Sequence, residues 1–465
     1  MFPLIEEIAS PPDVMHTLRQ FAHLPCVLLF DSARSDTRLG RYSFLMADPV
    51  DFEEVQAAEF GEDPFASMRS VTANWSTENA SAELPPFQGG YAGLLGYELG
   101  EAFEKLPRAK TDEFQMPALV AGLYDWVIAW DHEQSRCWII SQGFPETDKS
   151  ARMQRARERM AMVRALLTLE PAEAKSVPKQ TSVPESQFEI KVLEGLLSNF
   201  SKDAYVDAVR KVIDYIYAGD IFQANLSQRL LYPQEQSSIE LYSRLRTRNA
   251  APFAGYFQWD DWSVLSASPE RFVRVENREV ETRPIKGTRK RSPGPEADLF
   301  TRDELRESRK DRAENVMIVD LLRNDLSRVC EPGSIRVPQL CTVETYETVQ
   351  HLVSEIRGRL RDGVDVWDLF AASFPGGSIT GAPKIRSMEI IAELEPTVRG
   401  PYCGSLFYVS CSGHADSNIL IRTFTCRNGW VQCPAGGGIV ADSDPQSEYE
   451  ETLHKAEGML RALRD

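Results

Sequence analysis

Residues 282–288 of the chain read TRPIKGT and place one lysine, Lys286, in a short β-like run directly before a Gly-Thr turn. Five further stretches accompany it in a fixed order along the chain. They are residues 219–228 (GDIFQANLSQ), 268–270 (SPE), 311–315 (DRAEN), 374–384 (FPGGSITGAPK) and 435–439 (AGGGI). A triplet such as SPE is common, so only the whole set in this order is informative about the fold.

In this order the stretches resemble the chorismate-utilising enzymes, which include the anthranilate, aminodeoxychorismate, isochorismate and salicylate synthases. The resemblance begins near residue 87, where FQGGY and then GYE match the family's N-terminal half, and it is strongest from residue 219 onward. The fold that it implies is α+β, with two facing antiparallel β-sheets and helices packed outside.

Composition is consistent with a globular protein and excludes few functions. The chain has 465 residues, which predicts one elaborated domain or two domains, with 42% hydrophobic and 26% charged residues. A net charge of −17 argues against a general nucleic-acid or anionic-membrane surface, but not against a small anionic substrate. The first residues lack a signal-peptide pattern, and no apolar run approaches the roughly 20 residues of a membrane span. We therefore expect a cytoplasmic protein, and the eight dispersed cysteines predict free thiols.

Three parts are predicted along the chain: a β-rich N-terminal part (1–170), a linker (171–187) and a catalytic part (188–465). The linker contains three prolines and lacks apolar periodicity. Apolar residues at helical spacing predict a helix over 203–218, and a charged helical stretch covers about 148–169. Strands are expected at 26–30, 124–130, 137–141, 253–259, 263–267, 271–276, 404–409, 418–426 and 430–433.

Two predicted helices carry carboxylates on one face. Asp311 and Glu314 are three residues apart in helix 309–322, and Glu448, Glu451 and Lys455 follow spacings of three and four in helix 446–464. Such faces are usually only solvated. The resemblance, however, aligns Glu314 and Glu451 with magnesium ligands, and Asp311 and Glu448 with direct or water-mediated support. The implied cofactor is Mg²⁺, a hard cation that takes few protein carboxylates and keeps several waters.

The implied substrate, chorismate, carries two carboxylates. One would bind the metal, with Lys455 nearby, and the resemblance assigns the other to Tyr402 and Arg422. Glycines allow backbone N–H groups to approach an anion, although three in a row alone predict a turn at the end of a strand. The remaining residues assigned to substrate binding are Gly436, Gly437, Gly438, Gln223, Thr288 and Ser378. Lys384, at a predicted helix start, is interpreted as structural.

Glu270 and His351 are the acid–base candidates. Glu270 follows an apolar strand, and the resemblance makes it the general acid beside C4 of the substrate; an apolar pocket would raise its proton affinity. An isolated histidine is usually a hydrogen-bonded core residue, but His351 aligns with an active-site histidine whose duty here stays open. Relatives that add water carry a lysine where this chain has Gln223. An amide cannot act as a base, so ammonia is the expected nucleophile.

Lys286 occupies the position that separates chemistries within the family. An alanine there resembles the anthranilate-forming members, and a lysine resembles those that form 4-amino-4-deoxychorismate. Most strand lysines simply extend to solvent. As a nucleophile, Lys286 would have to be neutral, which burial beside Arg283 or the metal could promote. The implied mechanism is a covalent lysine adduct at C2, followed by attack of ammonia at C4.

The predicted function is therefore synthesis of aminodeoxychorismate for para-aminobenzoate and folate, with anthranilate synthesis as the alternative. A non-catalytic paralogue that binds chorismate or an amino acid is the alternative from another class. No G-x-C-x-G nucleophile pattern occurs, so a separate glutaminase subunit is expected as the partner that supplies ammonia. Residues 28–32 (LLFDS) replace a segment that binds feedback tryptophan in anthranilate synthases, which leaves feedback inhibition open.

Overall fold

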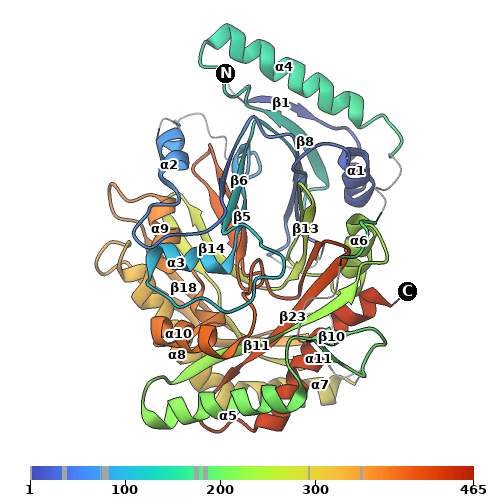
Figure 1. Ribbon diagram of the computed structural model, residues 1–465. Coiled ribbons are helices and arrows are strands. Elements are labelled where there is room, and N and C mark those ends of the chain that lie inside the picture. The colour runs from blue at the N-terminus through green and yellow to red at the C-terminus, as the bar shows by residue number, and fades with distance from the viewer. Residues whose placement is uncertain are drawn as a thin grey trace.

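Two antiparallel β-sheets form the centre of the molecule, and helices cover their outer faces (Figure 1). The computed structural model describes residues 3–33, 39–73, 75, 83–171, 177–181, 187–291, 294–345 and 349–464. One hydrophobic core joins the sheets, since Phe44, Val127 and Phe257 of the first pack with Leu94 and Leu406 of the second. This α+β arrangement confirms the fold class predicted from the sequence.

The first sheet contains strands from both halves of the chain. Their spatial order is β1 (Leu4–Glu7), β8 (Arg136–Ser141), β7 (Trp126–Asp131), β3 (Tyr42–Met46), β2 (Leu28–Asp31), β12 (Phe253–Trp259), β13 (Trp262–Ser268), β22 (Thr423–Arg427), β23 (Trp430–Ile439), β11 (Gln223–Pro233), β10 (Leu197–Ser198) and β9 (Phe188–Glu189), and β19 (Gly381–Ala382) also pairs with β11.

The second sheet is also mixed in sequence. Its order is β16 (Ile285–Lys290), β18 (Val349–Arg359), β15 (Glu279–Thr282), β14 (Arg271–Glu276), β21 (Ala415–Asn418), β20 (Ser405–Ser410), β5 (Gly90–Leu95), β6 (Leu119–Tyr124) and β4 (Asp51–Val55), and β17 (Arg336–Thr345) also pairs with β18. Strand β5 pairs with β20, so the predicted N-terminal and catalytic parts share this sheet as they share the first.

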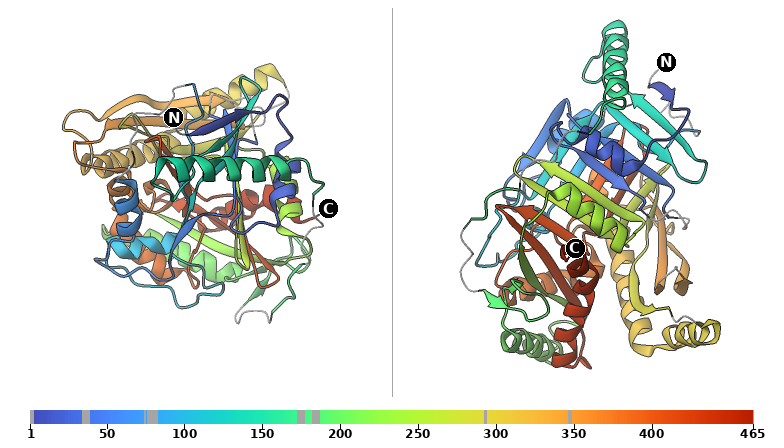
Figure 2. Two further views of the ribbon diagram at one scale, coloured as in Figure 1. Left: turned by 90° about the horizontal axis from the view of Figure 1, so that it is seen from above. Right: turned by 90° about the vertical axis from the view of Figure 1, so that its right-hand side faces the viewer.

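The helices pack their apolar faces on the outer sides of the sheets. In α5, Ser201 accepts a hydrogen bond from the Ala204 amide at the start, and Gly219 ends the helix at a φ of 85°. The helices are α1 (Val14–Phe21), α2 (Ala66–Thr72), α3 (Gly100–Phe103), α4 (Lys149–Leu166), α5 (Lys202–Ala218), α6 (Ser238–Arg248), α7 (Pro295–Glu307), α8 (Arg309–Ser327), α9 (Val366–Ser373), α10 (Lys384–Leu394) and α11 (Pro445–Leu463), with short 3₁₀ turns η2 (Tyr97–Leu99) and η3 (Gly377–Ile379). Figure 2 shows α4 lying across the top of the molecule, away from α5 and α11.

The chain crosses between the sheets at two places where the sequence predicted one continuous strand. Within residues 124–130, β6 ends at Tyr124 and β7 begins at Trp126, and the buried Asp125 lies between them. Residues 418–426 divide in the same way between β21 and β22, and Arg422 at this crossing has a φ of 52°. Both single-strand predictions are wrong, because an apolar pattern can continue through a crossing without revealing it.

Two glycine-containing segments form strands where turns were predicted. The run 436–438 continues β23 and pairs with β11, so that Gly437 lies opposite Leu226. The Gly-Thr pair after Lys286 continues β16, with a bulge between Lys286 and Thr288. Gly287 adopts a φ of 74° there, which explains the glycine without requiring a turn.

Within the described ranges, no helix has the length and apolar character required to cross a membrane. All eight cysteines lie in those ranges and are free thiols, which confirms the prediction from their spacing.

Candidate active site

Most of the predicted site residues lie where helices α5, α8, α10 and α11 gather around strands β11 and β23, at the lower end of Figure 1. Carboxylate side chains of α8 and α11 lie against the glycine run of strand β23. Strand β16, which carries Lys286, contacts α8. The site is therefore built from both sheets.

Glu270 is a buried carboxyl group directly after β13. Burial raises the pKa of Glu270 to about 7, although the Ser378 hydroxyl, the Lys286 charge and the Ile285 amide each lower it in part. A carboxyl group with this pKa can hold a proton near neutral pH and donate it to a leaving hydroxyl group. The raised proton affinity therefore comes from burial, beside neighbours that are themselves polar or charged.

Lys286 lies beside Glu270, and one residue contacts both. The Lys286 Nζ donates a hydrogen bond to the Ser378 carbonyl oxygen at 3.0 Å and lies 3.7 Å from Glu314 Oε1. Because the Ser378 hydroxyl binds Glu270, the turn η3 holds the candidate acid and the candidate nucleophile together. Arg283, suggested above as a group that could keep the amine neutral, pairs instead with Glu344 and Glu355.

Gln223 and Glu314 form a pair against the glycine run. Gln223 Nε2 donates to Glu314 Oε1 at 2.6 Å, and Gln223 Oε1 is a buried atom without a hydrogen-bond partner among the described residues. A Cβ placed on Gly438 would lie 2.0 Å from Gln223 Nε2 and 2.5 Å from Glu314 Oε1. Only glycine allows the two side chains to meet here, which gives Gly438 a packing role that its sequence context did not reveal.

Glu448, Glu451 and Lys455 of α11 lie against the neighbouring Gly437, whose Cβ position is 3.4 to 3.5 Å from their end groups. Lys455 Nζ contacts Glu451 Oε1 at 2.7 Å and donates to the Gly436 carbonyl oxygen at 3.0 Å. Burial raises the pKa of Glu448. Burial acts in the same direction on Glu451, but Lys455, Lys310 and Lys286 outweigh it and lower the pKa of Glu451.

Glu314 and Glu451 carry the type of oxygen ligand that Mg²⁺ prefers, and water would have to supply the rest of its coordination. Among the described residues, no three acidic, histidine or cysteine side chains form a metal cluster by themselves. Glu314 and Glu451, however, lie against consecutive residues of β23 and are paired with Lys286 and Lys455. Two carboxylates supplemented by water are a common set for Mg²⁺, whose hard oxygen ligands these are.

Asp311, Thr288 and His351 lie around strand β16, next to this group. Asp311 Oδ2 accepts a hydrogen bond from Arg289 at 3.2 Å and the side chain lies against Gly287, whereas Glu314, also on α8, lies 3.7 Å from Lys286. Thr288 Oγ1 and His351 Nδ1 are 2.8 Å apart, which links β16 to β18. His351 is buried, and Thr288 is exposed.

Arg422 and Tyr402 lie beside the segment that leads to Glu270. The Arg422 carbonyl oxygen accepts from the Ala267 amide, and burial lowers the pKa of Arg422. No ion pair forms between Arg422 and another described residue, so its desolvated charge is available to an anion. The guanidinium carbon of Arg399 lies over the Tyr402 ring, 5.9 Å from its centroid.

The sequence did not reveal the ion pair between Glu395 and Arg399, which joins β11 to the turn η3. Arg399 is buried and binds Glu395 through two hydrogen bonds, and it also donates to the carbonyl oxygens of Asn225 and Ile379. It thereby ties β11 to the turn that carries Ser378. The four-residue spacing between Glu395 and Arg399 was a visible signal, but the main-chain acceptors were not. Lys384, interpreted as structural, donates to Asp325 at 2.7 Å in the interior.

Asp31, in the segment 28–32 for which feedback inhibition was left open, is already bound by side chains of this chain. Its buried carboxylate accepts hydrogen bonds from Arg246 at 2.6 Å, from Tyr242 at 2.9 Å and from Ser43 at 3.3 Å. An amino-acid ammonium group would have to displace Arg246 to reach it.

The chain belongs to the chorismate binding enzyme family, whose model matches residues 26–461. It is 39% identical to "Aminodeoxychorismate synthase component 1" of Salmonella typhimurium, over 100% of this chain and 99% of that protein. It is also 39% identical to "Anthranilate synthase component 1" of Streptomyces coelicolor, over 94% of this chain and 83% of that protein. The structure of anthranilate synthase component I from Streptococcus pneumoniae aligns with a TM-score of 0.76 at 29% identity, over 91% of this chain and 93% of that one.

Proposed function

We propose that the chain is the chorismate-converting component of an aminodeoxychorismate synthase, which makes 4-amino-4-deoxychorismate from chorismate and ammonia. The observation that carries the proposal is Lys286, whose Nζ shares Ser378 with the protonatable Glu270. Overall identity does not decide between the two activities, since relatives of both names are 39% identical to the chain. The lysine does, because the family resemblance associates alanine at that position with anthranilate formation.

The chemistry proceeds through two displacements. The neutral Lys286 amine bonds to C2, the two ring double bonds shift, and the C4–O bond breaks. Glu270 gives its proton to the departing hydroxyl group, which leaves as water. Ammonia then bonds to C4, the double bonds return, and the C2–N bond breaks, so that Lys286 leaves as the neutral amine. The new ammonium group at C4 gives one proton to the Glu270 carboxylate, which restores the acid. Chorismate and ammonia are consumed, and aminodeoxychorismate and water are formed.

Substrate binding uses the charges that the site leaves available. Arg422 and the Tyr402 region would take the enolpyruvyl carboxylate, since Arg422 is desolvated and lacks an ion pair with any described residue. Glu314 and Glu451 would hold Mg²⁺, with Glu448 and Asp311 in support, and Lys455 would lie near the ring carboxylate. When bound, Mg²⁺ would neutralise that carboxylate and stabilise negative charge near C2. It would also occupy Glu314, which is now the carboxylate beside Lys286.

Ammonia would come from glutamine through a separate glutaminase subunit, and the product would serve para-aminobenzoate and folate synthesis. Gln223 supports ammonia as the nucleophile, because its amide cannot deprotonate a water molecule and Nε2 is held by Glu314. The isolated chain should therefore use ammonium salts, and should use glutamine only after the glutaminase is added. Glutamine-dependent turnover by the purified chain would contradict this part of the proposal.

Intact-protein mass spectrometry tests the covalent step. With chorismate and Mg²⁺ but without ammonia, the wild-type chain should gain the mass of chorismate minus water, and peptide mapping should place the adduct on Lys286. Lys286→Ala should lose the adduct and most aminodeoxychorismate formation, a loss of several kcal/mol in transition-state stabilisation, on the order of a thousandfold or more. The exposed Lys211→Ala is the matched control and should behave as wild type.

The alternatives give distinct results in the same assay. Fluorescent anthranilate from the wild-type chain would favour anthranilate synthesis, whereas its appearance only in Lys286→Ala would indicate that the amine normally blocks attack at C2. A non-catalytic paralogue would leave chorismate unconsumed in the presence of ammonium and Mg²⁺. An adduct at another residue, or full turnover by Lys286→Ala, would remove Lys286 from its proposed role.

A further inference from the structure

Strands β15 and β16 both pair with β18 in the same register, and a break of two residues separates them. Thr282 at the end of β15 lies opposite Ile356, and Ile285 at the start of β16 lies opposite Val353. Arg283 and Pro284 fill the interval. Proline has no amide hydrogen to donate, so the ladder is weakened immediately before Lys286, although the Ser354 amide still donates to the Pro284 carbonyl oxygen at 3.2 Å.

Arg283 bridges this break with its side chain. The same register sets Arg283 opposite Glu355, and one arm of its guanidinium group binds that carboxylate while the other binds Glu344 of β17. The Arg283 side chain is 11% exposed and the Glu355 side chain 5%, so this contact is shielded from water. A bidentate arginine between two carboxylates fixes orientation as well as position.

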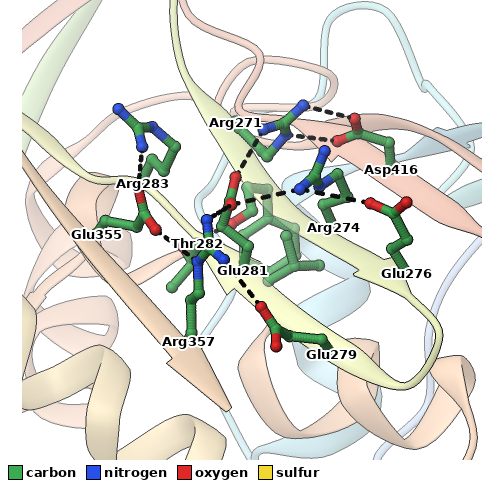
Figure 3. A network of polar contacts seen from close by, with 12 residues as sticks. Arg271, Arg274, Glu276, Glu279, Glu281, Thr282, Arg283, Glu355, Arg357 and Asp416 are labelled. Carbon is green, nitrogen blue, oxygen red and sulfur yellow. Dashed lines mark hydrogen bonds and ion pairs between the residues drawn. The ribbon is translucent and has the colours of Figure 1, made fainter. Parts of the chain in front are cut away.

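The clamp, defined here as Arg283 with Glu344 and Glu355, is anchored in a larger network (Figure 3). Glu355 also accepts from Arg357, which binds Glu281 at 3.1 Å. The network continues across β15, β14 and β21 through pairs of alternating charge. Its further members are Arg271, Arg274, Glu276, Glu279 and Asp416. An interconnected network that spans neighbouring strands resists local displacement more than an isolated pair does.

Alternation along the strand places the clamp and the candidate nucleophile on opposite faces. Side chains three residues apart in a strand point to opposite sides, so Arg283 faces the charge network while Lys286 points to Ser378 and Glu314. A rotation of the strand at Pro284 would carry the Lys286 Nζ away from these partners. After the bulge at Gly287 the strand pairs with β18 again, through Thr288 and His351, so the clamp is the side-chain restraint on the Pro284 side of Lys286.

We propose that Arg283 is a positioning residue for Lys286: the clamp holds the strand across the Pro284 break and so fixes the direction of the amine. This inference rests on the function proposed above. Its consequence is a loss in kcat with little change in KM for chorismate, because the candidate substrate-binding residues other than Thr288 lie on other segments. A purely structural arginine would affect stability without this division.

The test compares Arg283→Lys and Glu344→Gln with Arg274→Lys, a network arginine that pairs with Glu276 and Glu281 and not with the clamp. Arg283→Lys keeps the charge but cannot bind two carboxylates with one planar fork. We expect the rate of adduct formation on Lys286 and the ammonia-dependent kcat to fall together by about tenfold to a hundredfold, the scale for small misplacement of a reacting group. Arg274→Lys should remain within about twofold of wild type on both measures, as expected for a partly exposed pair.

Glu344→Gln removes only one arm of the clamp and tests the idea if Arg283→Lys does not fold. Hydrogen exchange of residues 282–290 should increase in both clamp variants and not in Arg274→Lys. Wild-type rates of adduct formation in folded clamp variants would overturn the inference while leaving the lysine chemistry intact. If the wild-type chain itself forms no adduct, the proposed lysine chemistry fails, and the positioning role fails with it.

Discussion

Replacement of Glu270 by glutamine should abolish turnover and, at neutral and alkaline pH, stabilise the fold. Glutamine has nearly the same shape as a protonated glutamate, and it can still accept hydrogen bonds from Ser378 and the Ile285 amide. It removes only the ability to ionise. The buried wild-type carboxyl has its pKa raised from 4.5 to about 7, so the folded state holds a proton that the unfolded chain releases.

The sign of the pH dependence follows from this raised pKa. Stability from the protonated carboxyl is fully present below pH 4.5, falls as the pH rises toward 7, and is lost above the folded-state pKa. A shift of this size corresponds to about 3 kcal/mol at 1.36 kcal/mol for each pKa unit. Glu270→Gln should therefore match wild type near pH 4.5 and exceed its unfolding free energy by up to about 3 kcal/mol at pH 8.

Urea unfolding of the two proteins at pH 5, 6, 7 and 8 measures this difference directly, and ammonia-dependent product formation measures the activity. Glu98 provides a matched control, because burial also raises its pKa to about 7, and it accepts from the Arg399 and Gly400 amides instead of contacting Lys286. Glu98→Gln should lose pH dependence of stability without the same loss of turnover. The assignment of Glu270 fails if Glu270→Gln retains activity or keeps the full wild-type pH dependence of stability.

Three further experiments test the glycine run, the candidate metal ligands and the Asp31 region. Gly438→Ala would place a methyl carbon 2.0 Å from Gln223 Nε2, so steady-state turnover should fall by about a hundredfold. Turnover should fall by less in Gly437→Ala, because the nearest atoms to that methyl carbon lie 3.4 Å away. Glu314→Ala and Glu451→Ala should each abolish Mg²⁺-dependent turnover and weaken Mg²⁺ binding in calorimetry. The circular dichroism spectrum of both variants should stay that of the wild type. Unaltered activity at limiting Mg²⁺ would exclude the residue as a ligand. Tryptophan at millimolar concentration should not inhibit, because Arg246 occupies the Asp31 carboxylate, and inhibition would show that this ion pair opens.

Local patterns predicted the long helices α4, α5, α8 and α11, because the information for a helix is carried by nearby residues. The spacing of Val206, Val209, Ile213 and Ile216 gave α5, which the structure has at Lys202–Ala218. Strand crossings could not be predicted in this way. Asp125 is buried between two apolar strands, and its neighbours continue the same hydrophobic pattern on both sides, so only the partner strands distinguish β6 from β7.

The candidate site, like the fold, could be predicted only in part from the sequence. Residue types and order drew attention to Glu270, Glu314 and Lys286, and the structure brings these three together through short contacts. The contact that joins the acid to the amine uses the main-chain carbonyl oxygen of Ser378, an atom that every residue possesses. No sequence pattern specifies which carbonyl faces a lysine, since that depends on how the turn is held by Arg399 from another segment.

The mixed composition of both sheets also determines when the protein can fold during synthesis. Strand β2 obtains its neighbour β12 only after residue 257 has been made, and β5 obtains β20 only after residue 410. Until then the growing chain exposes unpaired strand edges, which are prone to associate with other chains. Emergence of the C-terminal strands from the ribosome, late in translation, is therefore what allows both sheets to close.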